Sequence, residues 1–292
     1  MKYETQMNAH RLPYKFPSLK AIRLTYSDEI PTEDDFPLFS SDYVYKQLYT
    51  LEAIVREAHL TSLTTLAIIN LIALPADFQR SGSFSYSLSK LTKLEVLFSA
   101  AIPGSHDSAA MSYNALFPKE DGQKRYCGNS EVPWSITDLT LASEEEQSNL
   151  VPLDMSTLQF PNLSSLTLRG VSFRLMEGLP LIVADQYIDE MVFILRHAAT
   201  LRTLVLVDCM TLTDNWSVIW ERFANELTQL VNLSVQYTMG TETNYSVYGI
   251  EHGDRISEVE FMEEEPETVE QDREAFERLV QIVDERRSRE LV

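Results

Sequence analysis

Apolar residues recur along this chain in a mixed spacing that neither a helix nor a single strand explains. In LRTLVLVDC, residues 201–209, the leucines are separated by three and then two positions, at Leu201, Leu204 and Leu206. An amphipathic helix would place apolar residues at i, i+3, i+4 and i+7, and a half-buried strand would alternate strictly. The pattern therefore predicts a short strand that the chain enters from a helix or a turn.

The same spacing recurs elsewhere in the chain. Counting LRTLVLVDC, the motif has seven copies, whose first apolar residues are Leu19, Leu63, Leu91, Ile136, Leu163, Leu201 and Leu230. One unit of this size cannot bury its apolar edge alone, so neighbouring units must cover it. The order Leu-x-x-Leu-x-Leu followed by Asn or Cys marks leucine-rich repeats. We expect an α/β leucine-rich-repeat solenoid, an irregular horseshoe of parallel strands with helices on its outer face, in which Cys209 is a buried structural thiol.

Helices are expected before several copies of the motif. Apolar residues with a helical period follow Asp42, Asp185 and Asp214, and aspartate is a favoured residue at a helix N-cap. The three expected apolar faces are Val44, Leu48, Leu51, Ile54, Val55 and Ala58; Ile188, Met191, Val192, Leu195 and Ala198; and Val218, Ile219, Phe223 and Leu227. Each helix leads directly into a motif, which supports the α/β class.

The C-terminal part of the chain has a different character. Between Glu258 and Glu274, nine acidic residues stand against a single arginine, which predicts a solvated connector outside the core. One side of a closing helix is then expected to carry Val269, Phe276, Leu279, Val280 and Val283. We therefore expect an irregular leucine-rich-repeat domain over residues 1–250, and an acidic connector and helix over 251–292 that cap the solenoid.

Charge and composition exclude several classes of function. The formal net charge is -20, so binding to nucleic acid is not expected, because it requires a basic surface. The most apolar run, Leu66–Ala76, is interrupted by Asn70 and closed by Pro75, too short for a membrane helix. Two cysteines and no secretory signal indicate a reducing compartment, the cytoplasm or the nucleus.

No catalytic pattern emerges from the sequence. None of the five histidines has a metal-binding spacing, and no nucleophile elbow or phosphate-binding glycine loop occurs. His197 sits at the end of an expected helix, where a packing role is favoured, and Trp216 and Trp220 are expected to pack inside the fold. We therefore expect no enzyme, no catalytic or metal-binding residue and no cofactor.

Three stretches resemble the C-terminal repeat region of fungal F-box/leucine-rich-repeat proteins: FPNLSSLTLRGVSF, HAATLRTLVLVDCMTL and DREAFERLVQIVDERR. In that family an N-terminal F-box docks onto Skp1 in an SCF-type ubiquitin ligase, and the repeats hold the substrate. The resemblance therefore implies a ubiquitin ligase adaptor. About fifteen residues precede the first copy, which begins at Phe16, and they contain no F-box-like opening. Skp1 is an expected partner only if an F-box lies upstream, so the chain is either a truncated relative or one without ligase docking.

We interpret the sequence as a protein-interaction module, either the substrate-recognition subunit of such a ligase or an F-box-less relative. A scaffold without any link to ubiquitin is the first alternative, and an α/β hydrolase is the second. Side chains between the motif leucines should line an open, concave face that holds a protein partner. The candidate contact residues on that face are Arg23, Lys93, Thr167, Arg169, Val205, Val207 and Gln236.

Overall fold

A computed structural model describes part of the 292-residue chain, and the structural statements below concern that part. The described residues are 16, 18–26, 47, 50–54, 62–71, 88–98, 134–143, 160–173, 189–211, 216–237 and 266–290. The chain divides into two compact units, Met1–Asp138 and Leu139–Val292. We refer to them as unit 1 and unit 2 and describe each by itself.

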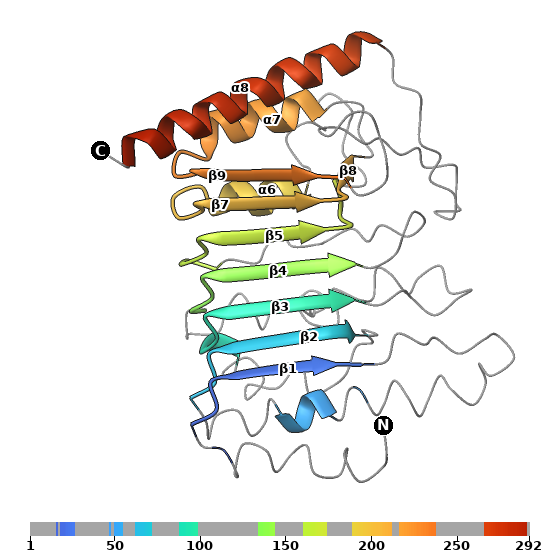
Figure 1. The fold of residues 1–292 in the computed structure, drawn as a ribbon, viewed down its shortest axis with the longest axis vertical. Helices are drawn as coiled ribbons and strands as arrows, with labels where there is room; N and C mark the ends of the chain where they lie inside the picture. Colours follow the sequence, from blue (N-terminus) through green and yellow to red (C-terminus); the bar gives the residue numbers. More distant parts are fainter. Residues whose placement is uncertain are drawn as a thin grey trace, which may run out of the picture. The chain divides into compact units, whose positions relative to one another are not determined.

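All seven copies of the motif form strands of one open sheet (Figure 1), whose order follows the sequence. The strands are β1 (Ala21–Thr25), β2 (Thr65–Leu71), β3 (Lys93–Phe98), β4 (Asp138–Ser143), β5 (Ser165–Arg169), β7 (Thr203–Val207) and β9 (Asn232–Gln236). A second, two-stranded parallel sheet joins β6 (Ser172–Phe173) to β8 (Met210–Thr211). A mostly parallel sheet accompanied by helices places the protein in the α/β class, as the sequence predicts.

In unit 1 the motif leucines form aligned rows across three parallel strands. Ile22 is paired with Leu66, and Leu66 with Leu94. Leu66 and Leu94 are fully buried, whereas Ile22 on the outermost strand is half-buried. The expected buried row is therefore confirmed inside the sheet and weakens at its edge.

Unit 2 repeats this arrangement. Leu166, Leu204 and Leu233 occupy one row across the parallel strands β5, β7 and β9. The first two are fully buried, but Leu233 is half-buried because β9 is the last strand of the sheet. The alternation of buried leucines with more exposed residues gives this part of the sheet one apolar face and one mixed face.

Three helices of unit 2 are described in full: α6 (Asp189–Arg196), α7 (Trp216–Glu226) and α8 (Pro266–Glu290). In α7 the expected residues Ile219 and Phe223 are buried. The expected face of α6 is partly wrong, because Val192 and Leu195 are only half-buried. The aromatic ring of Phe193 is buried in their place, so the buried face of α6 is rotated from the expected one.

The helix expected after Asp42 lies mostly outside the described residues. Its described part, 50–54, is helical, and Leu51 and Ile54 are completely buried, as the periodicity predicts. The prediction of a repeat domain over 1–250 with a capping segment over 251–292 is not tested by the division into two units and stays a prediction.

A left-handed residue stands at the same position in three copies of the motif, directly after β5 and β7 and one residue before the end of β2. Asn70, Gly170 and Asp208 have φ angles of 58°, 62° and 50°. In unit 2, the amide of Gly170 donates to Val207 O at 2.9 Å, and that of Asp208 donates to Gln236 O at 2.8 Å. Glycine, asparagine and aspartate are the residues that tolerate this conformation best, so the turn after each strand is encoded locally.

Candidate protein-interaction surface

The structure divides the seven candidate contact residues between the two units. Arg23 on β1 and Lys93 on β3 are exposed residues of unit 1. They do not share a row, since Arg23 aligns with Ala67 and Lys93 aligns with Thr65. With β2 lying between their strands, the structure does not bring these two basic side chains together.

The other five candidates lie together in unit 2. Thr167 is paired with Val205 across β5 and β7, and Arg169 with Val207. Val207 is in turn paired with Gln236 on β9. The two valines are half-buried, while Arg169 and Gln236 on either side are exposed. We call Thr167, Arg169, Val205, Val207 and Gln236 the valine patch.

Polar groups at the rim of the valine patch interact with their neighbours. Arg169 Nε lies 3.9 Å from Asp208 Oδ2, and the arginine side chain remains 49% exposed. Gln236 donates from Nε2 to Ser234 Oγ at 3.0 Å. These surface contacts are weak, so the rim groups can exchange them for contacts to a partner at little cost.

Where the strands begin, the main chain makes a repeated hydrogen-bond pattern that the sequence analysis missed. The carbonyl of the residue before one strand accepts two consecutive amides from the start of the next strand. We call these acceptors the ladder carbonyls. In the described part of the chain they belong to Lys20, Thr64, Thr92, Ser164 and Arg202.

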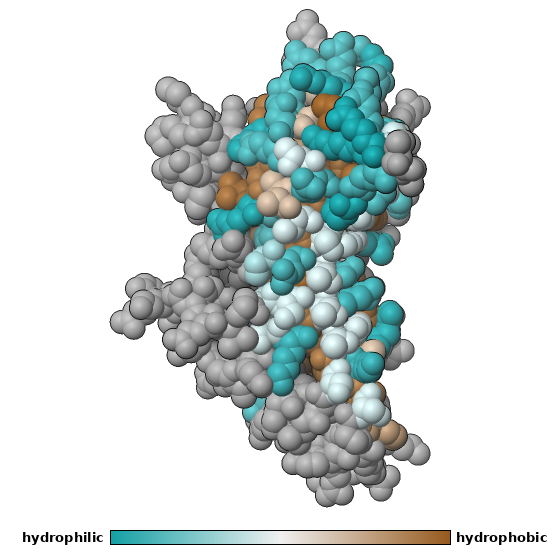
Figure 2. All heavy atoms as spheres, turned by 90° about the vertical axis from the view of Figure 1, so that its left-hand side faces the viewer, coloured by the Kyte–Doolittle hydropathy of each residue, from teal (hydrophilic) through white to brown (hydrophobic). Residues whose placement is uncertain are grey.

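In unit 1, threonine hydroxyls reinforce the same pattern. Thr64, Thr92 and Thr137 donate from Oγ1 to the ladder carbonyls of Lys20, Thr64 and Thr92, at 3.4, 3.2 and 3.1 Å. In Figure 2 the side of the molecule where the strands begin faces the viewer. Much of the described surface on this side is pale or teal, which marks residues of near-neutral or hydrophilic character. The sequence signal for the pattern is a threonine directly after the first motif residue, as in Leu63-Thr64.

Helix α8 supplies a carboxylate to the start of α7. Asp272 is completely buried, and its Oδ1 accepts the amide of Ser217 at 2.6 Å. Burial raises the pKa of Asp272 to about 6, against the opposing effect of hydrogen bonds from Ser217 and Trp216. The expectation that the acidic run 258–274 stays outside the core is therefore wrong at Asp272, because this carboxylate caps another helix.

The far end of α8 supplies guanidinium groups. Arg286 donates to Leu227 O at 2.6 Å and to Ala224 O at 3.0 Å, at the C-terminal end of α7. Since Asp272 lies at the start of α7 and Arg286 at its end, the two helices run in the same direction, as Figure 1 shows. A negative group at the N-terminus and a positive group at the C-terminus both oppose the dipole of α7.

Arg287 completes the strand-start pattern of unit 2. Val231, the residue before β9, is equivalent to the residues that carry the ladder carbonyls, and its carbonyl accepts Arg287 Nε at 2.9 Å. Arg202, one residue before β7, pairs with Glu290 of the same helix. Helix α8 therefore occupies the position that a following strand would take at the start of β9.

Aromatic packing fixes α8 against α7. Trp216 and Trp220 stack with ring centroids 4.6 Å apart, and Phe276 of α8 meets Trp220 edge-on at 5.4 Å. Leu279 and Val283 are buried on the same side of α8. This confirms the packing role expected for the two tryptophans and, for the closing helix, the burial of Leu279 and Val283. The expected face is partly wrong at Val269 and Val280, which are only half-buried.

Two groups that often carry chemistry are structural in this fold. His197 accepts the Phe160 amide at Nε2, 3.0 Å away, while Nδ1 lies 2.8 Å from Phe193 O. Burial lowers the pKa of His197 to about 4, so it is neutral at physiological pH. Burial also raises the pKa of the Cys209 thiol to about 12, and its Sγ lies 3.5 Å from Leu168 O. Neither group is poised for catalysis.

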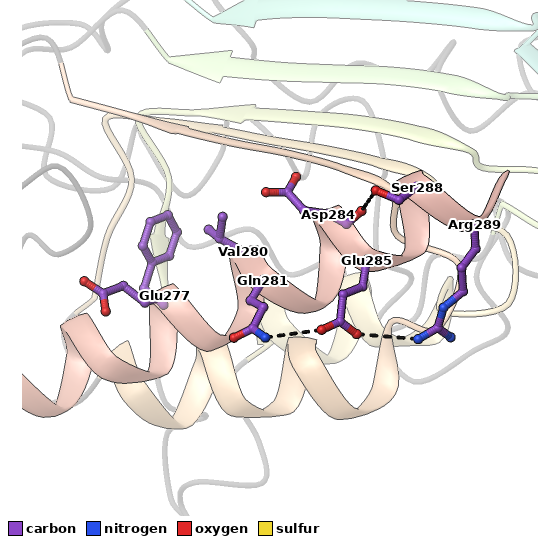
Figure 3. Close-up of a pocket in the computed structure, with 8 residues that line it drawn as sticks. Glu277, Val280, Gln281, Asp284, Glu285, Ser288 and Arg289 are labelled. Carbon is purple, nitrogen blue, oxygen red and sulfur yellow. Dashed lines mark hydrogen bonds and ion pairs between the residues drawn. The ribbon is translucent and has the colours of Figure 1, made fainter. Parts of the chain in front are cut away.

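A groove of about 800 Å³ runs along α8 (Figure 3) and is lined by side chains from successive turns of that helix. Its polar groups interact within the helix: Gln281 with Glu285 at 3.2 Å, and Arg289 with Glu285 at 3.5 Å. Val280 supplies apolar surface between them. The groove contains no arrangement of a nucleophile and a base.

Among the residues that the structure describes, no cluster of three or more histidine, cysteine or acidic side chains could hold a metal ion. Within the same ranges, no helix combines the length and the apolar character needed to cross a membrane. Comparison of the chain with protein-family models, with curated proteins and with solved structures finds no match in any of the three.

Proposed function

We propose that this protein is a non-enzymatic protein-interaction module, built as a leucine-rich-repeat solenoid, that holds a protein partner on the valine patch. The observation that carries the proposal is the pairing of Val205 and Val207 with polar residues on both adjacent strands, among which the two neighbours of Val207, Arg169 and Gln236, are exposed. An apolar centre with a polar rim is the composition of a protein–protein contact. The rigid strands beneath it hold the contact residues in a fixed arrangement.

The patch also has the electrostatic character that partner binding requires. The net charge of the chain is -20, yet the valine patch carries Arg169 and no acidic side chain among its five members. A neutral to weakly basic area on an acidic protein favours a defined docking position. The partner surface that fits it is apolar at its centre, with hydrogen-bonding groups and a carboxylate opposite Arg169.

We test the patch by replacing both valines with serine, Val205→Ser and Val207→Ser. The matched control replaces two half-buried helical valines of the same unit, Val192→Ser and Val218→Ser. Partners captured from a native lysate are quantified by mass spectrometry, and melting temperatures are compared. We expect the patch variant to lose its partners at least tenfold while the control keeps them. Equal loss in both variants, or retention in both, contradicts the proposal.

The resemblance to F-box/leucine-rich-repeat proteins supports a narrower version, in which the module is the substrate-recognition subunit of an SCF-type ubiquitin ligase. The scaffold alternative predicts the same patch without ligase docking. Purified Skp1 mixed with the full chain separates the two, because only a ligase subunit forms a complex that survives gel filtration. If no complex forms, the narrower version is wrong for this chain and the scaffold version stands.

A further inference from the structure

The hydrogen bonds to the ladder carbonyls all run in one direction across the sheet, from amides of a later strand to a carbonyl of an earlier one. Thr64 and Thr65 both donate to Lys20 O, at 2.9 and 3.0 Å. In unit 2, Arg202 and Thr203 donate in the same way to Ser164 O, at 2.8 and 2.9 Å. At the start of β2, β3, β4, β7 and β9, two adjacent amides therefore donate to one carbonyl, the ladder carbonyl of an earlier strand.

Strand β1 has the same two amides, and no strand precedes it in the part of the sheet that the structure describes. It lies at the end of the strand order, and by position in the motif its amides are those of Lys20 and Ala21. Among the residues that the structure describes, no carbonyl accepts them. In unit 2 the corresponding edge is covered differently, since Arg287 of α8 takes the carbonyl of Val231.

The register defines which groups of β1 are available. Lys20 O receives the amide of Thr65, and the Tyr26 amide donates to Ile69 O at 3.0 Å. In a parallel pair the amides of alternate residues point toward the same neighbour. The amides of Ile22 and Leu24 therefore point toward β2, and those of Ala21, Arg23 and Thr25 point to the open edge.

The side chains of β1 are also incompletely covered. Ile22 and Leu24, whose counterparts on β2 and β3 are fully buried, are only half-buried. Phe16, an apolar residue three positions before Leu19, is 53% exposed. Among the described residues, therefore, none covers the main chain or the apolar row of β1 as a neighbouring strand covers those of β2 and β3.

We propose that the open edge of β1 binds an extended segment of a partner protein, which adds to the sheet as a strand parallel to β1. The segment that fits has a free carbonyl opposite the Lys20 and Ala21 amides, followed by apolar residues at alternate positions beside Ile22 and Leu24. Main-chain hydrogen bonds supply affinity in this mode of recognition, and alternate side chains supply specificity. A two-fold pair of identical chains would place β1 against β1 in the antiparallel sense, which the strand-start pattern does not fit.

This edge belongs to unit 1 and is separate from the valine patch of unit 2. The inference therefore goes beyond the proposed function and does not depend on it. The serine variants of Val205 and Val207 should leave strand addition at β1 unchanged.

The chain itself supplies a suitable probe. A fluorescein-labelled peptide of residues 160–170, FPNLSSLTLRG, contains the ladder carbonyl of Ser164 followed by Leu166 and Leu168. Its affinity for the full chain is measured by fluorescence anisotropy, and a peptide of scrambled order is the control. We expect saturable binding of the motif peptide and at least tenfold weaker binding of the scrambled one.

Two variants at one position separate the main chain from the side chain. Arg23→Pro removes an outward amide, and proline is tolerated on an edge strand when its nitrogen faces away from the sheet. Arg23→Ala removes the guanidinium but keeps the amide. We expect the proline variant to bind the peptide at least tenfold more weakly than the alanine variant. Equal binding by the two variants overturns the proposal.

Amide hydrogen exchange on the unaltered chain keeps the test decisive even if the proline variant fails to fold. On adding the peptide, we expect slower exchange at Ala21, Arg23 and Thr25, with little change at Ile22 and Leu24. Absence of protection at the first three overturns the proposal. So does a dimer of the free chain that Arg23→Pro dissociates, because the occupant of the edge would then be a second copy.

Discussion

At the scale of single residues, Asp272 shows how a charged side chain enters the core of an acidic protein. Its carboxylate is fully buried, and Oδ1 accepts the Ser217 amide, while Oδ2 has no hydrogen-bond partner. Burial without full compensation disfavours the charged form, which is why the pKa is raised. The sequence does not predict that Asp272 caps α7, since this residue lies in a run of acidic residues typical of a solvated segment.

The raised pKa predicts how stability depends on pH. Folding moves the pKa of Asp272 from 3.8 to about 6, so its contribution to stability is fully present below pH 4 and is lost as the pH rises through 6. Asp272→Asn keeps the oxygen acceptor and does not titrate. We expect the variant to gain stability relative to the wild type between pH 4 and 7, by up to about 3 kcal/mol.

Urea unfolding at unit intervals of pH measures this difference in the free energy of unfolding. Because both proteins carry every other acidic group, the comparison isolates Asp272. A difference that stays constant from pH 4 to pH 7 would show that the carboxylate is equally ionised in the folded and unfolded chains.

At the scale of the elements, α8 stabilises α7 from both ends. Asp272 neutralises the start of α7, and Arg286 satisfies the carbonyls of Ala224 and Leu227 at its end. The described part of α7 has no acidic residue in its first turn and no basic residue in its last turn. The groups that oppose its dipole therefore come from a helix some 50 residues away in the sequence.

The helix-end contacts of Arg286 should be visible in stability. Arg286→Met keeps most of the aliphatic stem but leaves the two carbonyls without these charged donors, and should cost about 1.5–3 kcal/mol. Arg289→Met is the matched control, because Arg289 lies one turn away with a side chain that is 77% exposed. Chemical denaturation gives both values. Equal effects of the two substitutions would mean that the contacts of Arg286 add nothing beyond surface charge.

The elements differ in how well the sequence predicts them. All seven strands follow from the motif, because its two-residue step places Leu204 and Leu206 on one face of β7 regardless of the surroundings. The face of α6 was predicted less well, since Val192 and Phe193 both fit a helical period and only tertiary packing selects between them. The valine patch also follows from the alternation, whereas the link between Arg287 and the last strand depends on contacts distant in the sequence.

At the scale of the whole molecule, the two edge strands of the sheet, β1 and β9, differ in the described residues that cover them. In unit 2, α8 covers the start of β9 through Arg287 and buries Leu279 and Val283. In unit 1, β1 keeps half-buried apolar residues, and no carbonyl of the described residues accepts the amides of Lys20 and Ala21. Among the described residues, a helix therefore covers the start of the last strand, β9, and none covers the start of β1.

Removal of everything after Gly253 should therefore destabilise unit 2. The truncated chain loses the cap on α7, exposes Trp220 to solvent and leaves Val231 O without Arg287. We expect the melting temperature to fall by about 10 °C, with increased binding of a hydrophobic dye. A chain cut after Arg289 is the control, because it retains these contacts. An unchanged melting temperature would show that α8 rests on the surface without supporting it.

The burial of Cys209 has a kinetic consequence. The pKa of the Cys209 thiol is about 12, and its side chain is buried. This residue therefore reacts with an alkylating reagent only while the surrounding main chain is open. When reclosing is faster than labelling, its labelling rate at neutral pH, followed by peptide mass, is the population of the open form multiplied by the reaction rate of an exposed thiol. The chain carries its own reporter of how often the leucine rows of unit 2 separate.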